Sequence, residues 1–192
     1  MKDSLFWIWL GLACTPGSET FITFARKNYS PYEIYSMTPS ELEAAFGKRN
    51  ADLRRLADKN LDDAKRINDY CFLRNVGLVS WEDEEYPLRL RQIENPPPLL
   101  YYTGRMPSSR DELFVSVVGT RTMSEYGRKT AFDISYDLAL AGAVVVSGMA
   151  LGIDGVASSG ALCAGGETVV VLGCGNGRYP ESDGRNTEGS AT

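Results

Sequence analysis

The sequence predicts an α/β protein in which a helical N-terminal domain is followed by an incomplete doubly wound parallel sheet. Two capping boxes and a long amphipathic stretch indicate helices in the first part of the chain. Three short apolar runs farther along, each ending in a glycine turn, indicate parallel strands. We therefore expect a helical domain over residues 1–75, a connector over 76–112, an α/β domain over 113–180 and a disordered tail over 181–192.

The first helix is predicted from the apolar stretch Leu5–Ala13, with Trp7 and Leu10 facing a core. The stretch is too short to span a bilayer. The residues before it carry no net positive charge, which a secretory signal would have. We interpret it as a buried helix rather than as a signal peptide.

Further helix starts are marked by Ser30-Pro31-Tyr32-Glu33 and Thr38-Pro39-Ser40-Glu41. Each places a hydroxyl at the N-cap, a proline at the first helical position and a glutamate three residues after the cap. Apolar residues then recur at helical steps up to Cys71. This spacing predicts one amphipathic helix from about Asp52 to Leu73.

The connector contains two short apolar runs, Val76–Ser80 and Leu99–Tyr102, which read as strands. Prolines at Tyr86-Pro87 and Asn95–Pro98 fix extended or turn geometry between them. We place the boundary between the two domains within this connector.

The α/β domain is predicted from the strands Leu113–Val118, Ala143–Val146 and Thr168–Leu172. Helices are expected over Tyr126–Ala141, with Ser124 as the N-cap, and over Asp154–Ala164. Right-handed crossovers would make the three strands parallel neighbours, as in a Rossmann-like sheet.

Composition excludes several classes of function. The 20 Lys and Arg against 25 Asp and Glu give a net charge of −5, so DNA binding requires a local basic patch. Histidine is absent and the four cysteines form no C-x-x-C pair, which argues against zinc sites and against histidine-based catalysis. We expect a cytoplasmic protein with reduced thiols, no metal, no cofactor and no membrane partner.

The glycine turns at 119–121, 147–148 and 173–175 are expected to line one crevice at the carboxyl ends of the strands. Backbone N–H groups at the following helix starts favour phosphate, and Arg121 adds a guanidinium fork. Thr120, Ser124 and Ser147 add neutral donors. The alternative, that these glycines serve only tight turns and packing, stays open.

The crevice favours binding over catalysis. A P-loop motif and a G-x-G-x-x-G motif are both absent, and no paired carboxylates surround the turns. Asp154 is the single acidic residue near a turn, and its position at a helix start predicts a capping role.

A set of motifs in fixed order carries a family resemblance. The set comprises Val118-Gly119-Thr120-Arg121, Tyr126-Gly127-Arg128, Ser147 to Asp154, Gly160-Ala161-Leu162, Gly165 to Thr168, Val171 to Gly175 and Tyr179-Pro180. In order and spacing it resembles the DNA-processing protein A (DprA/Smf) family. The helical front and the proline-rich connector are similar to that family's SAM-like N-terminal domain and its linker.

The resemblance implies a Rossmann-like domain that binds single-stranded DNA, forms a homodimer and loads RecA during natural transformation and recombination, without catalysis. Gly119, Thr120 and Arg121 match the family's phosphate-contacting turn, and Gly148 and Gly152, after the donor Ser147, match its second glycine turn. Arg128 and Lys129 would extend a basic track along the following helix, although an ordinary solvated charge pattern also accounts for them.

Three departures from the family pattern shape the expectation. Leu151 stands where the family has arginine, and Ala157-Ser158-Ser159 replaces its histidine. The chain ends soon after Tyr179-Pro180, before the part that the family uses for dimerisation and RecA contact. We expect a truncated, frameshifted or diverged copy that keeps DNA binding better than those two contacts. The alternative is a nucleotide-binding enzyme of the related Rossmann-like phosphoribohydrolase group, whose P-G-G-x-G-T-x-x-E turn is absent here.

Overall fold

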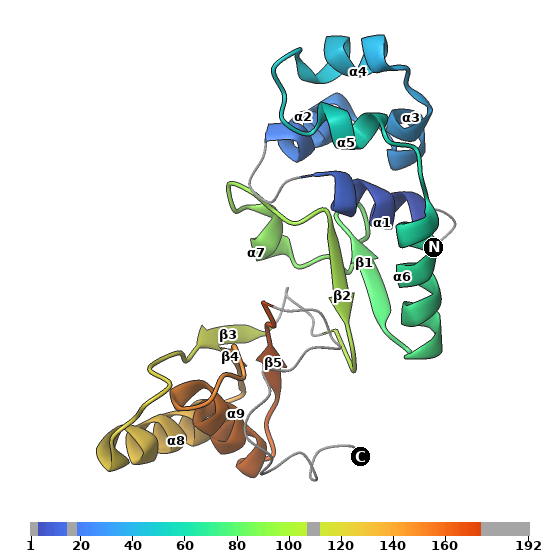
Figure 1. Ribbon diagram of the computed structural model, residues 1–192. Helices are drawn as coiled ribbons and strands as arrows, with labels where there is room; N and C mark the ends of the chain where they lie inside the picture. The colour runs from blue at the N-terminus through green and yellow to red at the C-terminus, as the bar shows by residue number, and fades with distance from the viewer. Residues whose placement is uncertain (1–3, 15–18, 107–111, 174–192) are drawn as a thin grey trace. The chain divides into compact units, whose positions relative to one another are not determined.

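The chain forms two compact units, Met1–Arg110 and Asp111–Thr192. The computed structural model describes residues 4–14, 19–106 and 112–173, coloured by residue number in Figure 1. Helices in these described ranges all lack the length and apolar character that crossing a membrane requires. The predicted tail at 181–192 and the motif Tyr179-Pro180 lie outside the described residues.

The first unit is mainly helical, as predicted. Its helices are α1 (Ser4–Ala13), α2 (Glu19–Lys27), α3 (Pro31–Ser36), α4 (Pro39–Phe46), α5 (Leu53–Ala57), α6 (Asp62–Leu73) and the short α7 (Leu88–Arg91). The strands β1 (Gly77–Ser80) and β2 (Leu99–Tyr102) pair antiparallel, with Leu78 opposite Tyr101. The segment that the sequence treats as a connector therefore builds a small sheet, and most of it belongs to the first compact unit.

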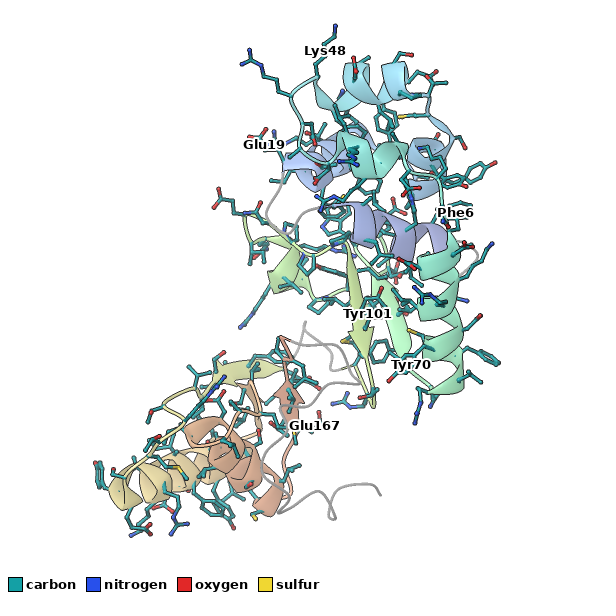
Figure 2. The ribbon with its side chains drawn as sticks, in the orientation of Figure 1. Phe6, Glu19, Lys48, Tyr70, Tyr101 and Glu167 are labelled. Atoms are coloured by element: carbon teal, nitrogen blue, oxygen red, sulfur yellow. The ribbon has the colours of Figure 1, made fainter. Side chains whose placement is uncertain are left out.

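Helix α1 forms the centre of this unit's core. It contacts α3, α5, α6 and β2, as the ribbon in Figure 1 shows. Trp7 and Leu10 are buried, which confirms the prediction of a buried first helix. At its start, Phe6 lies against the rings of Tyr32 and Tyr35, with both centroid distances 5.0 Å (Figure 2).

Both predicted capping boxes are present. The Ser30 hydroxyl accepts a hydrogen bond from the Glu33 amide, and the Glu33 carboxylate accepts one from the Ser30 amide at 2.6 Å. Thr38 and Glu41 repeat the arrangement at α4. These backbone N–H bonds, with a second bond from each cap hydroxyl, lower the pKa of both glutamates.

The prediction of one helix from Asp52 to Leu73 is wrong, because the chain breaks between α5 and α6. The Asp58 carboxylate accepts the Asn60 amide at 3.0 Å, a local bond that competes with the helix. The carbonyls of Asp58 and Lys59 accept hydrogen bonds from Trp9 and Tyr35, at 3.0 and 2.9 Å. Side chains of α1 and α3 thus hydrogen-bond to carbonyls that, in a continuous helix, would accept the helix's own backbone N–H groups.

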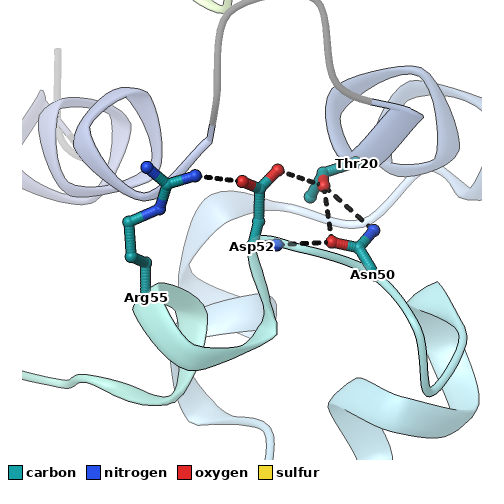
Figure 3. A network of polar contacts seen from close by, with 4 residues as sticks. All are labelled: Thr20, Asn50, Asp52 and Arg55. Atoms are coloured by element: carbon teal, nitrogen blue, oxygen red, sulfur yellow. Dashed lines mark hydrogen bonds and ion pairs between the residues drawn. The ribbon is translucent and has the colours of Figure 1, made fainter.

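A buried polar network ties α2 to the segment that leads into α5 (Figure 3). The fully buried carboxylate of Asp52 accepts a hydrogen bond from the Thr20 hydroxyl and forms an ion pair with Arg55. The Asn50 side chain accepts the Asp52 amide at 2.8 Å and also bonds to Thr20. Burial of a carboxylate is tolerated here because both of its oxygens have partners.

The second unit is a parallel β-α-β-α-β arrangement, as predicted. Its elements are β3 (Leu113–Ser116), α8 (Glu125–Leu140), β4 (Ala143–Ser147), α9 (Ile153–Cys163) and β5 (Thr168–Val170). The strands lie in the order β3-β4-β5 and pair in parallel, with Val115 opposite Val145. Helices α8 and α9 contact each other and β4, so both cover the same face of the described sheet (Figure 1).

Strands β3 and β5 end two residues earlier than predicted. The hydrogen-bond ladder nevertheless continues past them, since the Val117 amide donates to Val146 at 3.0 Å and the Val171 amide donates to Ser147 at 2.9 Å. Beyond these bonds the backbone leaves the sheet. Val117 and Val171 therefore still bond to β4, and Val118 and Leu172 lead into the turns.

Small residues let α8 and α9 approach closely. A Cβ on Gly160 would lie 2.5 Å from the Phe132 carbonyl oxygen, a distance that real Cβ atoms essentially never show. The buried cluster between the helices and the sheet consists of Ala139 of α8, Val145 of β4, and Ala157 and Ala161 of α9. This packing sets the two helix N-termini side by side above the strand ends.

Candidate nucleic-acid interface

Two of the predicted turns lie together at one edge of the second unit. Residues 119–122 follow β3 and residues 148–152 follow β4. Because β3 and β4 are parallel neighbours, their carboxyl ends open on the same edge. Helix α8 then begins at its N-cap Ser124, whose hydroxyl accepts the Gly127 amide at 3.1 Å, as predicted.

Asp154 joins these two turns. Its Oδ1 accepts a hydrogen bond from the Gly119 amide at 3.0 Å, and its Oδ2 accepts one from the Gly148 amide at 3.2 Å. The prediction that Asp154 caps its own helix is wrong. Helix α9 has Gly152 as its N-cap and no side-chain capping bond. The carboxylate reaches across to the strand ends because both turns present an N–H group there.

Close packing of the backbone reinforces this link. The Ile153 amide donates to the Thr120 carbonyl at 3.2 Å. Gly152 adopts φ +96°, and a Cβ added there would lie 2.2 Å from the same carbonyl oxygen. A Cβ on Gly119 would lie 2.8 Å from the Ile153 side chain. Glycine is required at 152 by its backbone conformation and by the lack of space.

Several predicted donors are therefore already used inside the protein. Ser147 is buried and its hydroxyl donates to the Val117 carbonyl at 2.8 Å. The amides of Gly119 and Gly148 donate to Asp154. These three residues shape the edge, and their donors point into it rather than toward solvent.

Thr120 and Arg121 lie on the exposed side of the first turn. The Thr120 hydroxyl closes the turn locally, since it donates to the Thr122 carbonyl at 2.9 Å and accepts the Thr122 amide at 3.2 Å. Arg121 is exposed and forms no ion pair with any residue that the structure describes. Its guanidinium is thus available to an external anion.

Arg128 and Lys129 lie in the first turns of α8. Arg128 forms an ion pair with Glu125, which lowers the pKa of that glutamate and raises the pKa of the arginine. Lys129 is exposed and, within the described ranges, makes no such pair. Of the predicted basic track, Arg121 and Lys129 carry uncompensated positive charge, whereas Arg128 is locally neutralised.

The second turn presents apolar side chains to solvent. Met149 adopts φ +53°, which is uncommon for a residue with a side chain. Leu151 is 67% exposed, at the place where the family resemblance led us to expect a cation. The third predicted turn has only Gly173 within the described residues.

Asp154 is the residue whose role the sequence analysis missed. A carboxylate two residues after a glycine N-cap reads as local capping, because short-range patterns favour that interpretation. The signal that could have predicted its bonds to both turns is its position in a parallel unit. There the start of the second helix faces the ends of two strands.

The parallel sheet, with glycine turns at its carboxyl edge, defines a Rossmann-like class of α/β unit. Within that class, the chain belongs to the family described as DNA recombination-mediator protein A, whose model matches residues 77–189. It is 34% identical to the Smf protein of Synechocystis over 139 residues, covering 68% of this chain and 35% of that protein. It is 38% identical to DprA of Streptococcus pneumoniae over 126 residues, covering 65% of this chain and 43% of that protein.

The crystal structure of DprA from Streptococcus pneumoniae has a similar fold. It superposes with a TM-score of 0.68 at 24% identity, over 88% of this chain and 57% of that one. The chain spans about a third of the length of the Smf relative. Membership of this family supports the resemblance seen in the sequence, and the phosphoribohydrolase alternative is not favoured.

Proposed function

We propose that this chain binds single-stranded DNA through the sugar-phosphate backbone, in the recombination step of natural transformation. The contact surface comprises the turn 119–122 and the start of α8, with Arg121 and Lys129 as the cations. Arg128 contributes after exchange of its Glu125 partner for phosphate. Gly119, Ser147, Gly148 and Gly152 build the surface from within.

One observation carries this proposal. Arg121 is an exposed cation without an ion-pair partner among the described residues, and it stands on a turn that Asp154 and Gly152 fix from behind. The fixed turn holds the backbone of Arg121 in place, and the planar guanidinium can bind a phosphate with two hydrogen bonds.

The same geometry supports binding in preference to catalysis. Asp154, at the two turns, is buried and its carboxylate is engaged by two amide donors, and Glu125, at the start of α8, is ion-paired with Arg128. A general base would need a free carboxylate within reach of substrate. Contacts to phosphate carry no base identity, so we expect little sequence preference.

RecA contact and homodimerisation are implied by the family resemblance alone. Our proposal is confined to DNA, because the observations on the described residues bear on a phosphate ligand. Relatives are named as DNA processing proteins, which agrees with a DNA ligand for the segment they share with this chain.

The test is a titration of oligo(dT) against the whole chain at several salt concentrations. Arg121→Ala removes one phosphate contact, so we expect about tenfold weaker binding and a salt slope reduced by about 0.7. Arg54→Ala, an exposed cation of α5, is the matched control and should leave the affinity within about twofold. Equal affinity of wild type and Arg121→Ala would refute the proposed surface.

A further inference from the structure

The carboxylate of Asp154 engages the backbone N–H groups that the two glycine turns would otherwise offer to a phosphate. Both of its oxygens accept a turn amide, from Gly119 at 3.0 Å and from Gly148 at 3.2 Å. The residue is only 8% exposed, so solvent competes little for these bonds. Hydrogen bonds from N–H groups to a charged acceptor are among the stronger ones in proteins.

This arrangement connects Asp154 to Arg121 by a short path. Gly119 is two residues before Arg121, and the carbonyl of the intervening Thr120 accepts the Ile153 amide at 3.2 Å. The turn that carries the arginine is therefore held at two successive residues by the start of α9. Release of the first bond would leave the turn attached through Thr120 alone.

We propose that Asp154 is a positioning residue for DNA binding. It acts as an internal anion that locks the two glycine turns and aims Arg121 outward, and it withholds the Gly119 and Gly148 amides from the ligand. Phosphate is then met by side chains on the outer rim. This inference rests on the proposed function, since it assigns a role within the same surface.

The sign of the effect distinguishes positioning from simple electrostatics. Asp154→Asn removes a negative charge near the surface, so electrostatics alone predicts unchanged or tighter binding of oligo(dT). Positioning predicts about tenfold weaker binding, because the substituted amide group keeps one acceptor and places a donor against the second N–H. Asp133→Asn, on the exposed surface of α8, is the control with the same change of charge.

A second variant perturbs the link without changing charge. A Cβ at Gly148 would lie 2.8 Å from Asp154 Oδ2, so Gly148→Ala displaces the carboxylate. We expect Gly148→Ala and Asp154→Asn to weaken binding to a similar extent. In an Arg121→Ala background each should lose most of its effect, because both act through that arginine. Effects that stay additive with Arg121→Ala would overturn the proposal, and so would tighter binding by Asp154→Asn.

Hydrogen exchange of the Gly119 and Gly148 amides gives a readout that does not depend on DNA. Both amides should be protected in the whole wild-type chain and should exchange at least tenfold faster in Asp154→Asn, while the amides of β4 keep their protection. Loss of β4 protection in Asp154→Asn would mean that the second unit unfolds in this variant. The oligo(dT) affinity and the amide exchange of Gly148→Ala would then test the link instead. Protected amides combined with no oligo(dT) binding by wild type would reject the DNA proposal and leave the link itself standing. Unprotected amides in wild type would reject the link.

Discussion

The two units of the chain differ in what fills their cores. The first unit buries large side chains, among them Trp7, Leu10 and Phe24, and adds a buried polar network around Asp52. In the second unit the buried cluster between helices and sheet is made of alanines of α8 and α9 and of Val145. The first unit therefore gains its stability from large apolar area, whereas the second depends on close backbone approach and on the Asp154 link.

Because of this difference, different kinds of substitution should destabilise the two units. Large-to-small changes should damage the first unit most, because they leave cavities. Additions of a methyl group should damage the second unit most, because glycines stand where backbones meet.

Truncation of a core side chain should separate the units most clearly. Leu10→Ala should lower the free energy of unfolding of the first unit by about 3 kcal/mol, since Leu10 is fully buried. Val145→Ala should cost the second unit about 2 kcal/mol. Hydrogen exchange of peptides from each unit would measure both. Equal loss of protection in the two units for Leu10→Ala would show that they unfold as one body.

The thiol of Cys14 offers a second probe of the first unit. Burial raises its pKa to about 12, with a smaller contribution from the nearby Asp52 charge. A thiol with so high a pKa stays protonated and unreactive at neutral pH. We expect Cys14 in wild type to resist alkylation and Leu10→Ala to speed its labelling at least tenfold, while the exposed Cys163 reacts promptly in both. Peptide mapping by mass spectrometry assigns each site.

Glycine-to-alanine substitutions should separate two reasons for a glycine, the lack of space for a Cβ and the positive φ of the backbone. Gly152 and Gly165 both have positive φ, but a Cβ on Gly165 would find nothing within 4 Å. Gly165→Ala should thus cost about 1 kcal/mol of stability. Gly152→Ala adds the clash with the Thr120 carbonyl, so we expect about 2 to 3 kcal/mol and loss of oligo(dT) binding. Similar melting temperatures for the two variants would contradict the close approach of the turns.

Loss of a helix cap should have a smaller effect, of about 1 kcal/mol in either unit. Ser124→Ala removes the cap of α8 and Thr38→Ala removes that of α4. Ser124→Ala should also weaken DNA binding, because α8 begins beside Arg121, whereas Thr38→Ala should not. Urea denaturation and an oligo(dT) titration of both variants check this pair.

The smallest effect is the pH dependence that the capping-box glutamates contribute. Hydrogen bonds from Thr38 lower the pKa of Glu41 in the folded state, so its contribution is present above the unfolded pKa and is lost as the pH falls through the folded pKa. Glu41→Gln should therefore melt slightly lower than wild type at pH 7, and the difference should shrink as the pH falls below the ordinary pKa of a glutamate. The cap of α8 has Gly127 in place of the glutamate, so it offers no such carboxylate. A wild-type advantage that stays constant as the pH falls would show that the Glu41 charge does not contribute to the cap.

The sequence was sufficient to predict the strands, most helices and both capping boxes, because these depend on local patterns of apolar and capping residues. It failed between Asp58 and Leu61, where Trp9 and Tyr35 hydrogen-bond the backbone from elements distant in sequence. The role of Asp154 escaped for the same reason, since its partners Gly119 and Gly148 lie on two other segments. Both failures come from tertiary hydrogen bonds that no local pattern records.

An amide chemical-shift map of the whole chain during titration with oligo(dT) would locate the DNA-binding surface. We expect the largest shifts on residues 119–129 and on 148–153, with the core of the first unit, including α1, unchanged. Shifts concentrated on the first unit, or no shifts at saturating oligonucleotide, would contradict the proposed surface.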